Sequence, residues 1–307
     1  MMPLAGDEIH CMNVDIPAPA TVGEVIRHCA GALERAPLFY GHGTDNAVDE
    51  AAALVLHAAG LPPAAPASIE ATFPAAARER LRDYLRRRID DREPAPYITG
   101  VAWFCGLPFH VDRRALIPRS PFAELIRNGF EPWRAPGPVR RILEIGTGSG
   151  CIAIAAALAF PGSEVVATDI SWPALQLARE NRAAHGVADR LHLVQADLLD
   201  GITGRFDLIL SNPPYVPDDE VAGLPAEYAH EPGLALVSGA DGLASARRIL
   251  QDAPPLLAPN GLLALEVGAG GPALEAAFPR IPFLWPEFEH GGEGIALLTA
   301  GDLAGVA

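Results

Sequence analysis

Residues 211–215 read SNPPY and directly follow the apolar run 206–210, which has the pattern of a buried strand. A single proline would end a strand, so the Asn, the second proline and the Tyr need another explanation. Two prolines stiffen the backbone, and the side-chain oxygen of Asn212 and the backbone carbonyl of Pro213 would then form a rigid pair of hydrogen-bond acceptors. We therefore predict a catalytic site rather than a turn alone. Its residues are Asn212, Pro213, Pro214 and Tyr215.

A glycine-rich turn follows the first predicted strand of the same half of the chain. Residues 143–150 read LEIGTGSG and lead into a predicted helix. Glycines let the backbone approach a ligand closely, and the N-terminus of a helix favours an anionic group. Glu144 is unfavourable for a pyrophosphate but suits the cationic end of a ligand. A glycine-rich turn that binds nothing stays open as the alternative, because the spacing is GxGxG rather than GxGxxG.

Two further strands also end in acidic residues. Asp169 ends the second strand about twenty residues after the glycine loop, where a carboxylate can accept both hydroxyls of a ribose. A helix cap is the alternative for Asp169, because Ser171 follows. Asp197 ends the third strand and could accept the exocyclic amine of an adenine. Parallel strands bring their carboxyl ends to one edge of an open α/β sheet, so these residues and Asn212 should share one site. The predicted cofactor-binding residues are Glu144, Gly146, Thr147, Gly148, Gly150, Asp169, Ile170, Asp197, Leu198 and Asn212.

Alternating strands and helices must position these residues. The alternation predicts a parallel α/β sheet with helices on both faces, built by residues 121–307. We expect seven strands, at 141–145, 164–170, 191–196, 206–211, 261–267, weakly at 283–288, and at 295–299. Helices are expected between them at 151–159, 172–185 and 244–257.

The first third of the chain has a different pattern. Residues 1–19 are predicted to be a loose leader, and residues 20–93 to form a small helical domain for substrate recognition. Its three helices should begin near Thr21, span 44–60 and span 75–91, because apolar residues recur there at three- and four-residue intervals. Residues 94–120 are predicted to link the two domains. Within this linker, residues 97–118 alternate and predict a β-hairpin with its turn at 106–108.

The residues at the strand ends resemble a known family. Residues 144–150 with Asp169 and Asp197 are similar to the motifs of class I S-adenosylmethionine-dependent methyltransferases, which have a seven-stranded Rossmann-like domain. SNPPY is similar to the motif of those that methylate planar amide or amino nitrogens. Most of the chain resembles the protein glutamine methyltransferases, in HGTDNAVDEA (42–51), GLPFHVDRRALIPRSPFAELI (106–126) and LPAEYAHEPGLALVSGADGL (224–243).

Two branches of that family differ after the hairpin. The branch that acts on release factors reads Pro-Arg-Pro-Asp/Glu-Thr-Glu, whereas residues 118–124 of this chain read PRSPFAE. This segment and HGTDN (42–46) are similar to the branch that methylates a glutamine of ribosomal protein three of the large subunit. The resemblance therefore implies S-adenosylmethionine as methyl donor, no metal, and a ribosomal protein as substrate. A release factor, or an adenine of DNA or RNA, remains the alternative substrate, and a non-catalytic ribosome-assembly factor is the alternative class.

The resemblance also gives SNPPY a chemical role. A glutamine amide nitrogen is a poor nucleophile because its lone pair is delocalised into the carbonyl, so it must be held in line with the methyl group and close to it. Asn212 and the Pro213 carbonyl would each accept one amide hydrogen, and Tyr215 would pack over the amide plane. No strong base is needed before transfer, because the nitrogen becomes acidic as it is alkylated.

The composition limits partners and location. A formal charge of −15 gives no general attraction to nucleic acid or to an anionic membrane, so ribosomal RNA would be contacted only locally, and neither DNA nor a membrane is an expected partner. Seven arginines between residues 78 and 92 are interleaved with acidic residues, which favours a solvated face with ion pairs.

The first twenty residues contain no Lys or Arg and predict no signal peptide. The longest apolar stretch, 151–160, is too short to span a membrane, and the four cysteines are scattered. We expect a cytoplasmic protein with free thiols.

Two groups of residues keep alternative roles. His230 and Glu231, with the proline that follows, either border the entrance for the substrate or form a capped loop. Arg119 and Glu124, with Ser120 between them, are expected to have a structural role or to cover the cofactor.

Overall fold

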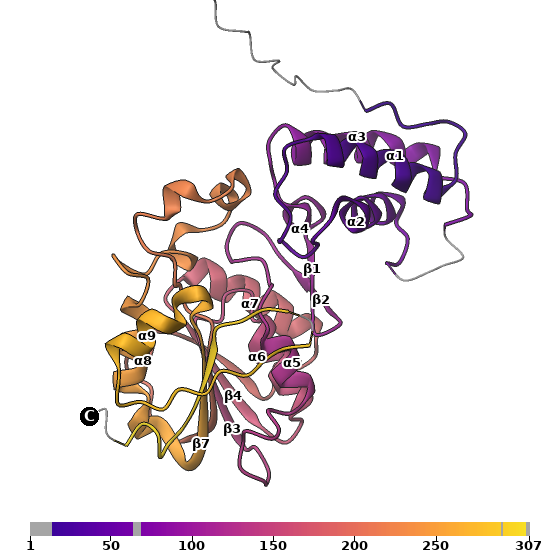
Figure 1. The fold of residues 1–307 in the computed structure, drawn as a ribbon. Helices are drawn as coiled ribbons and strands as arrows, with labels where there is room; N and C mark the ends of the chain where they lie inside the picture. The colour runs from indigo at the N-terminus through magenta and orange to yellow at the C-terminus, as the bar shows by residue number, and fades with distance from the viewer. Residues whose placement is uncertain (1–13, 64–68, 290, 305–307) are drawn as a thin grey trace, which may run out of the picture. The chain divides into compact units, whose positions relative to one another are not determined.

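The computed structural model describes residues 14–63, 69–289 and 291–304. The chain divides into two compact units, residues 1–100 with 225–230, and residues 101–224 with 231–307 (Figure 1). We call them the helical unit and the α/β unit. The segment 225–230 belongs to the helical unit although the chain on both sides of it belongs to the α/β unit.

The helical unit forms where the periodicity predicts it. Its elements in the described residues are α1 Val22–Arg35, α2 Ala47–Ala59, a 3₁₀ helix Ala75–Ala77, α3 Arg78–Ile89, α4 Ala95–Thr99 and a 3₁₀ helix Ala226–His230. Thr21 and Glu24 form a reciprocal cap at the start of α1, with N···O distances of 2.7 and 3.2 Å. Asn46 caps α2 by accepting from the Asp49 backbone N–H at 2.9 Å, and Gly60 ends it in the left-handed conformation. The three predicted helices are confirmed, and α4 is an addition to them.

Part of the predicted leader belongs to this unit. Ile16 is only 2% exposed and packs in the core of the helical unit. The Arg78 guanidinium donates to the carbonyl oxygens of Ile16 and Pro17, at 2.9 and 2.6 Å. Residues 14–19 are thus held in place rather than loose, because one apolar side chain and two backbone carbonyls find partners on the helices. The rest of the predicted leader, 1–13, lies outside the described residues.

A two-stranded hairpin begins the α/β unit. β1 (Val101–Phe104) and β2 (Leu107–His110) pair antiparallel. The turn consists of Cys105 and Gly106, whose φ angles are 52° and 76°, so the predicted turn at 106–108 was displaced by one residue. Two-residue hairpin turns of this kind need positive φ at both central positions. Pro108 is tolerated within β2 because a strand with one neighbour has a free edge.

The α/β unit has a six-stranded sheet in the described residues. Its strands are β3 Arg141–Ile145, β4 Glu164–Asp169, β5 Leu191–Gln195, β6 Phe206–Ser211, β7 Leu257–Glu266 and β8 Ile295–Thr299. They lie in the order β5-β4-β3-β6-β7-β8, in which β3 to β7 run parallel and β8 runs antiparallel to β7. The strand order reverses between β3 and β6, and open α/β sheets bind ligands at such a point.

The predicted strand at 283–288 does not form. A single bridge between Leu284 and Leu297 of β8 is all that remains of it. Pro282 and Pro286 flank this bridge and have no N–H to donate to a ladder, which limits the pairing to one residue. The α/β class is confirmed, with six strands in the described residues in place of the seven expected.

Helices cover both faces of the sheet (Figure 1). They are α5 Phe122–Arg127, α6 Cys151–Ala159, α7 Trp172–Ala184, α8 Ala244–Asp252 and α9 Gly271–Ala277. α6 and α7 contact β3, β4 and β5 on one face, while α8 and α9 contribute to the core on the other. α8 ends earlier than residue 257 because Pro254 and the proline after it form a 3₁₀ turn. Further 3₁₀ turns are Val221–Gly223, Gly233–Ala235 and Gly268–Gly270.

Candidate active site

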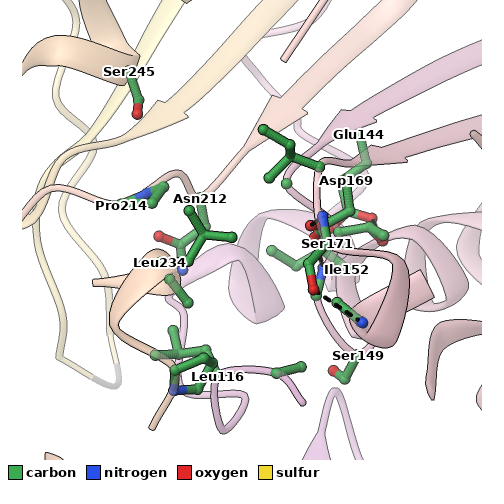
Figure 2. Close-up of a pocket in the computed structure, with 18 of the residues that line it drawn as sticks. Leu116, Glu144, Ser149, Ile152, Asp169, Ser171, Asn212, Pro214, Leu234 and Ser245 are labelled. Carbon is green, nitrogen blue, oxygen red and sulfur yellow. Dashed lines mark hydrogen bonds between the residues drawn. The ribbon is translucent and has the colours of Figure 1, made fainter. Parts of the chain in front are cut away.

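A pocket opens at the carboxyl ends of the parallel strands, within the α/β unit (Figure 2). Asn212 and Pro214 lie on one side of it in Figure 2, and Asp169, Ser171 and Ile152 lie on the other. The predicted site residues that line the pocket are Glu144, Gly146, Thr147, Gly148, Asp169, Ile170, Asp197, Leu198, Asn212 and Pro214. Gly150, Pro213 and Tyr215 are next to lining residues in the chain but do not line the pocket themselves.

Several backbone N–H groups of the glycine loop have hydrogen-bond acceptors within the protein. Gly146 and Thr147 both donate to the Thr168 carbonyl, at 2.9 and 2.8 Å. Gly148 donates to the Asp169 carboxylate at 2.8 Å. A loop that binds phosphate points such N–H groups at the anion, whereas here the Thr168 carbonyl and the Asp169 carboxylate already accept these three. The loop is therefore unsuited to a pyrophosphate.

Three glycines give this loop its path. The φ angles of Gly146, Gly148 and Gly150 are 74°, 56° and 83°, a region that other residues rarely occupy. A Cβ atom on Gly150 would also lie 3.2 Å from the Cβ of Ala178 in α7. Gly150 thus lets α6 begin close against α7, which explains its place behind the pocket rather than in its wall.

Glu144 is a buried carboxyl at the back of the pocket, 1% exposed. It accepts a short hydrogen bond from the Thr147 hydroxyl and one of 2.9 Å from the Ala153 backbone N–H. Burial raises the pKa of Glu144 to about 8, so this carboxyl is neutral near pH 7 in the structure described. A cation in the pocket would favour the ionised form and lower that pKa. The site thus suits a positively charged ligand end.

Asp169 supports the start of α7 without being its cap, and its role toward a ribose stays a prediction. Its two oxygens accept from the backbone N–H groups of Gly148 and Ser171, each at 2.8 Å, and Ser171 caps α7. Burial raises the pKa of Asp169, while these hydrogen bonds oppose that shift. Each carboxylate oxygen has a second lone pair, so the fixed carboxylate still has acceptor capacity toward the pocket.

Asp197 has a partner that the sequence did not indicate. Both oxygens of its carboxylate accept from the Arg248 guanidinium, at 2.8 and 2.9 Å, and Arg248 also lines the pocket. Leu198 next to it has a φ of 54°, an uncommon conformation for a residue other than glycine. The Leu198 carbonyl accepts from the Thr168 hydroxyl at 3.1 Å. Asp197 and Leu198 therefore form a fixed wall whose carboxylate is shared with an arginine.

The SNPPY loop is anchored at both ends. The Ser211 hydroxyl donates to the Ile145 carbonyl at 2.9 Å, which joins the ends of β6 and β3. After the two prolines, the Val216 backbone N–H donates to the Leu236 carbonyl at 2.8 Å. Asn212 between these anchors is half-buried and faces the pocket. Its side-chain oxygen is thus held on a loop that has little freedom to move.

Arg119, Ser120 and Glu231 support the pocket wall, whereas His230 bonds within the helical unit. The Arg119 guanidinium donates to both oxygens of Glu231, at 2.6 and 2.7 Å, and the Ile117 backbone N–H donates to the same carboxylate. Arg119 and Ser120 line the pocket, so Glu231 braces one of its walls. The His230 ring bonds to the Asp91 carbonyl within the helical unit.

Metal ligands, thiols and membrane spans can be assessed over the described residues. No group of three or more His, Cys, Asp or Glu side chains there could hold a metal ion. Of the cysteines in this part, Cys29, Cys105 and Cys151 are free, while Cys11 lies outside it. None of the helices there is both long and apolar enough to cross a membrane.

The pocket fits a nucleoside that carries a cation better than one that carries phosphate. Its polar groups include the carboxyl groups of Asp169 and Asp197, which disfavour anions when ionised, and that of Glu144, whose ionised form a cation would favour. Ile170 is 48% exposed in its wall and offers an apolar surface to a flat ring. S-adenosylmethionine has a ribose, an ammonium and a sulfonium and no phosphate, and so agrees with these groups.

Comparisons with known proteins identify what this chain is similar to. The family model described as methyltransferase small domain matches residues 134–226. The ribosomal protein uL3 glutamine methyltransferase of Bordetella pertussis is 46% identical over 91% of this chain and 95% of its own length. That of Xanthomonas campestris pv. campestris is 45% identical over 99% of this chain and 96% of its own length. A methyltransferase structure from Pyrococcus furiosus is 23% identical, with a TM-score of 0.47, over 63% of this chain and 88% of its own.

Proposed function

We propose that this chain, which belongs to the family of ribosomal protein uL3 glutamine methyltransferases, methylates the side-chain amide nitrogen of a glutamine in uL3, with S-adenosylmethionine as donor. The single observation that supports this most is the position of Asn212. Its half-buried amide faces a pocket whose other side presents the carboxyl groups of Asp169 and Glu144. One cavity would therefore hold both the glutamine amide that receives the methyl group and the cofactor that donates it.

The chain's own residues would hold the methyl donor. When bound, S-adenosylmethionine supplies an electrophilic methyl group on a positively charged sulfur. Asp169 would accept the ribose hydroxyls with its second lone pairs, and Ile170 would pack on the adenine. Glu144, once ionised, would balance the cationic end. Asp197 would receive the adenine amine only by sharing its oxygens with Arg248.

The SNPPY loop would hold the glutamine amide. The Asn212 oxygen and the Pro213 carbonyl each accept one amide hydrogen, which fixes the plane of the amide and returns electron density to its nitrogen. Because Ser211 and Val216 anchor the loop, these acceptors need no ordering when the substrate binds. The nitrogen is thereby aimed along one direction, which is the condition for in-line transfer.

The helical region 20–93 would recognise the ribosomal protein. The pocket would contact only the one glutamine side chain of the substrate, so selecting uL3 among many proteins needs a further surface.

The arginines on and after α3 give little support to a role in binding ribosomal RNA. Each of the seven arginines between 78 and 92 has an acceptor within its own unit. The acceptors are Ile16 and Pro17 for Arg78, Ala58 for Arg80, Asp15 for Arg82, Asp83 and Asp91 for Arg86, Glu93 for Arg87, Glu50 for Arg88 and Glu227 for Arg92.

The decisive experiment is methyl transfer to purified uL3. The chain is incubated with S-adenosylmethionine and either free uL3, large-subunit particles or a release factor, and the products are digested and sequenced by mass spectrometry. We expect one added methyl group on a glutamine of uL3. Methylation of the release factor alone would overturn the proposal, and transfer only to particles would return ribosomal RNA to the list of partners. Because ribosomes work in the cytoplasm, methylation of a ribosomal protein would also place the reaction there.

A first prediction concerns the ribose contact. Asp169→Ala should weaken the binding of S-adenosylmethionine about tenfold or more, because a hydrogen bond to a charged group contributes about 1.5–3 kcal/mol. Isothermal titration calorimetry measures the affinity. Asp189→Ala, the same change at an exposed position of the α/β unit, should leave it unchanged. Equal affinities of wild type and Asp169→Ala would contradict the assignment, provided that circular dichroism shows the variant to be folded.

A further inference from the structure

Glu266 is a buried carboxyl next to the candidate site that the proposed mechanism does not use. It is the last residue of β7, and the residue is 4% exposed. β7 pairs with β6, so Glu266 follows the residue that lies opposite Ser211, the start of the SNPPY loop. A buried carboxyl needs hydrogen-bond donors, and the donors to Glu266 show which segments it connects.

Two donors come from two different segments near the pocket. The Ser120 hydroxyl donates a short hydrogen bond to Oε2 of Glu266, and Ser120 itself lines the pocket. The Tyr215 hydroxyl donates a longer bond of 3.5 Å to Oε1. The Ser120 oxygen also accepts from the Phe122 backbone N–H at 3.1 Å, which fixes the start of α5. Glu266 therefore joins the segment after the hairpin to the SNPPY loop.

The Tyr215 ring is held from a second side. Gly268 has a φ of 52°, and a Cβ atom on it would lie only 2.9 Å from Cε2 of Tyr215. The ring thus lies directly against the Gly268 backbone, a contact that no larger residue permits. With its hydroxyl at Glu266 and its edge at Gly268, Tyr215 has little freedom to rotate.

We propose that Glu266 is a positioning residue, whose two carboxylate oxygens hold Ser120 and Tyr215 and so fix the pocket wall and the SNPPY loop relative to each other. This inference rests on the proposed function, because it concerns the orientation of the loop that would hold the glutamine amide. Glu266 acts through Tyr215 and makes no contact with the reacting atoms.

The protonation of Glu266 should therefore matter. Burial raises its pKa to about 7, while the bond from Ser120, the charge of Arg119 and the bond from Tyr215 oppose that shift. Arg119 in turn is paired with Glu231. The ionised carboxylate accepts both hydrogen bonds, whereas the neutral acid carries a proton on one oxygen and loses acceptor capacity there. Above about pH 7 the brace is complete, and below it one of the two bonds weakens.

The test compares Glu266→Gln with a matched control. The amide has nearly the same shape but offers one acceptor oxygen, so we expect kcat for uL3 to fall about tenfold. The affinity for S-adenosylmethionine should stay within about twofold, because the variant leaves the carboxyls on the donor side in place. Tyr215→Phe should lower kcat similarly, and the double variant no further. Glu275→Gln is the control, since Glu275 is exposed on α9 and accepts a hydrogen bond from the Trp285 indole.

A spectroscopic measurement keeps this test separate from the proposed function. Tyrosine labelled with ¹³C at Cζ gives five signals in this chain, and Tyr215→Phe identifies the one of Tyr215. In wild type we expect that signal to shift with pH around 7, and in Glu266→Gln the shift should vanish. If the Tyr215 signal does not titrate there, or titrates equally in Glu266→Gln, the inference is overturned. If wild type shows the titration but transfers no methyl group to uL3, the proposed function fails and the Glu266 brace stands.

Discussion

Asn212→Ala should lower kcat for methyl transfer by about 10²–10³, which is the usual loss when one oriented polar group is removed from a transition state. The Asn212 oxygen holds an amide hydrogen of the substrate and weakens the resonance that ties up the nitrogen lone pair. Without it the nitrogen is poorly aimed and less nucleophilic. The affinity for S-adenosylmethionine should fall far less, because Asp169 and Glu144 on the other side of the pocket remain. Single-turnover transfer to uL3, with calorimetric binding measured alongside, separates the two effects.

Two companion variants sharpen this result. Asn212→Asp keeps an acceptor and adds a charge, so it should retain part of the activity. Asn128→Ala removes an exposed asparagine of the same unit and should transfer at the wild-type rate. If Asn212→Ala also transferred at that rate, SNPPY would serve only to end β6.

The strand ends could be predicted because the information is local. Each parallel strand is a short apolar run, and the polar residue after it must lie at the edge where ligands bind. Asp169 and Asn212 were found in this way, and both line the pocket. The same rule applied to β7 would have found Glu266, which ends that strand.

Tertiary partners could not be predicted because nothing in the local sequence marks them. Arg248 lies on α8 among other polar residues, and only the folded chain brings it 2.8 Å from Asp197. The strand at 283–288 was expected from its apolar residues, but Pro282 and Pro286 leave it one bridge. The segment 225–230 belongs to the helical unit, where Glu227 accepts a hydrogen bond from Arg88, which lies 139 residues earlier in the chain.

Arg88 is the centre of a buried ionic network in the helical unit. Its guanidinium is 1% exposed and donates to Glu50 at 2.7 Å, to Glu227 at 3.0 Å and to the Phe39 carbonyl at 2.8 Å. Glu227 also accepts from Arg92 and from the Phe39 backbone N–H. Burial disfavours the charge on Glu227, but these hydrogen bonds outweigh it and lower its pKa to about 2. Glu227 thus joins its segment to Phe39, Arg88 and Arg92 of the same unit.

Arg88→Met should destabilise the helical unit by about 3–5 kcal/mol, the usual cost of breaking a buried ion pair by removing one partner. Glu50 then loses its ionic partner and Glu227 keeps only Arg92, so the expected cost exceeds that of the lost hydrogen bonds. Hydrogen exchange measured by mass spectrometry should show faster exchange in α2, α3 and residues 225–230. The sheet of the α/β unit, whose core is separate, should keep its protection.

Arg86→Met is the matched control, because Arg86 lies two residues away on the same helix and pairs with Asp83 and Asp91 on the surface. Exposed pairs contribute about 0–1 kcal/mol, so this variant should exchange nearly as wild type does. Adding Glu227→Gln to Arg88→Met should restore part of the stability, since it removes the buried charge that Arg88 had balanced. A loss of similar size in Arg86→Met, or no recovery in the double variant, would show that the network does not hold residues 225–230.

Glu231, four residues beyond Glu227, braces the pocket wall through Arg119. An Arg88 variant with faster exchange in 225–230 and unchanged protection at 231–237 would therefore show that the two anchors of this stretch act independently.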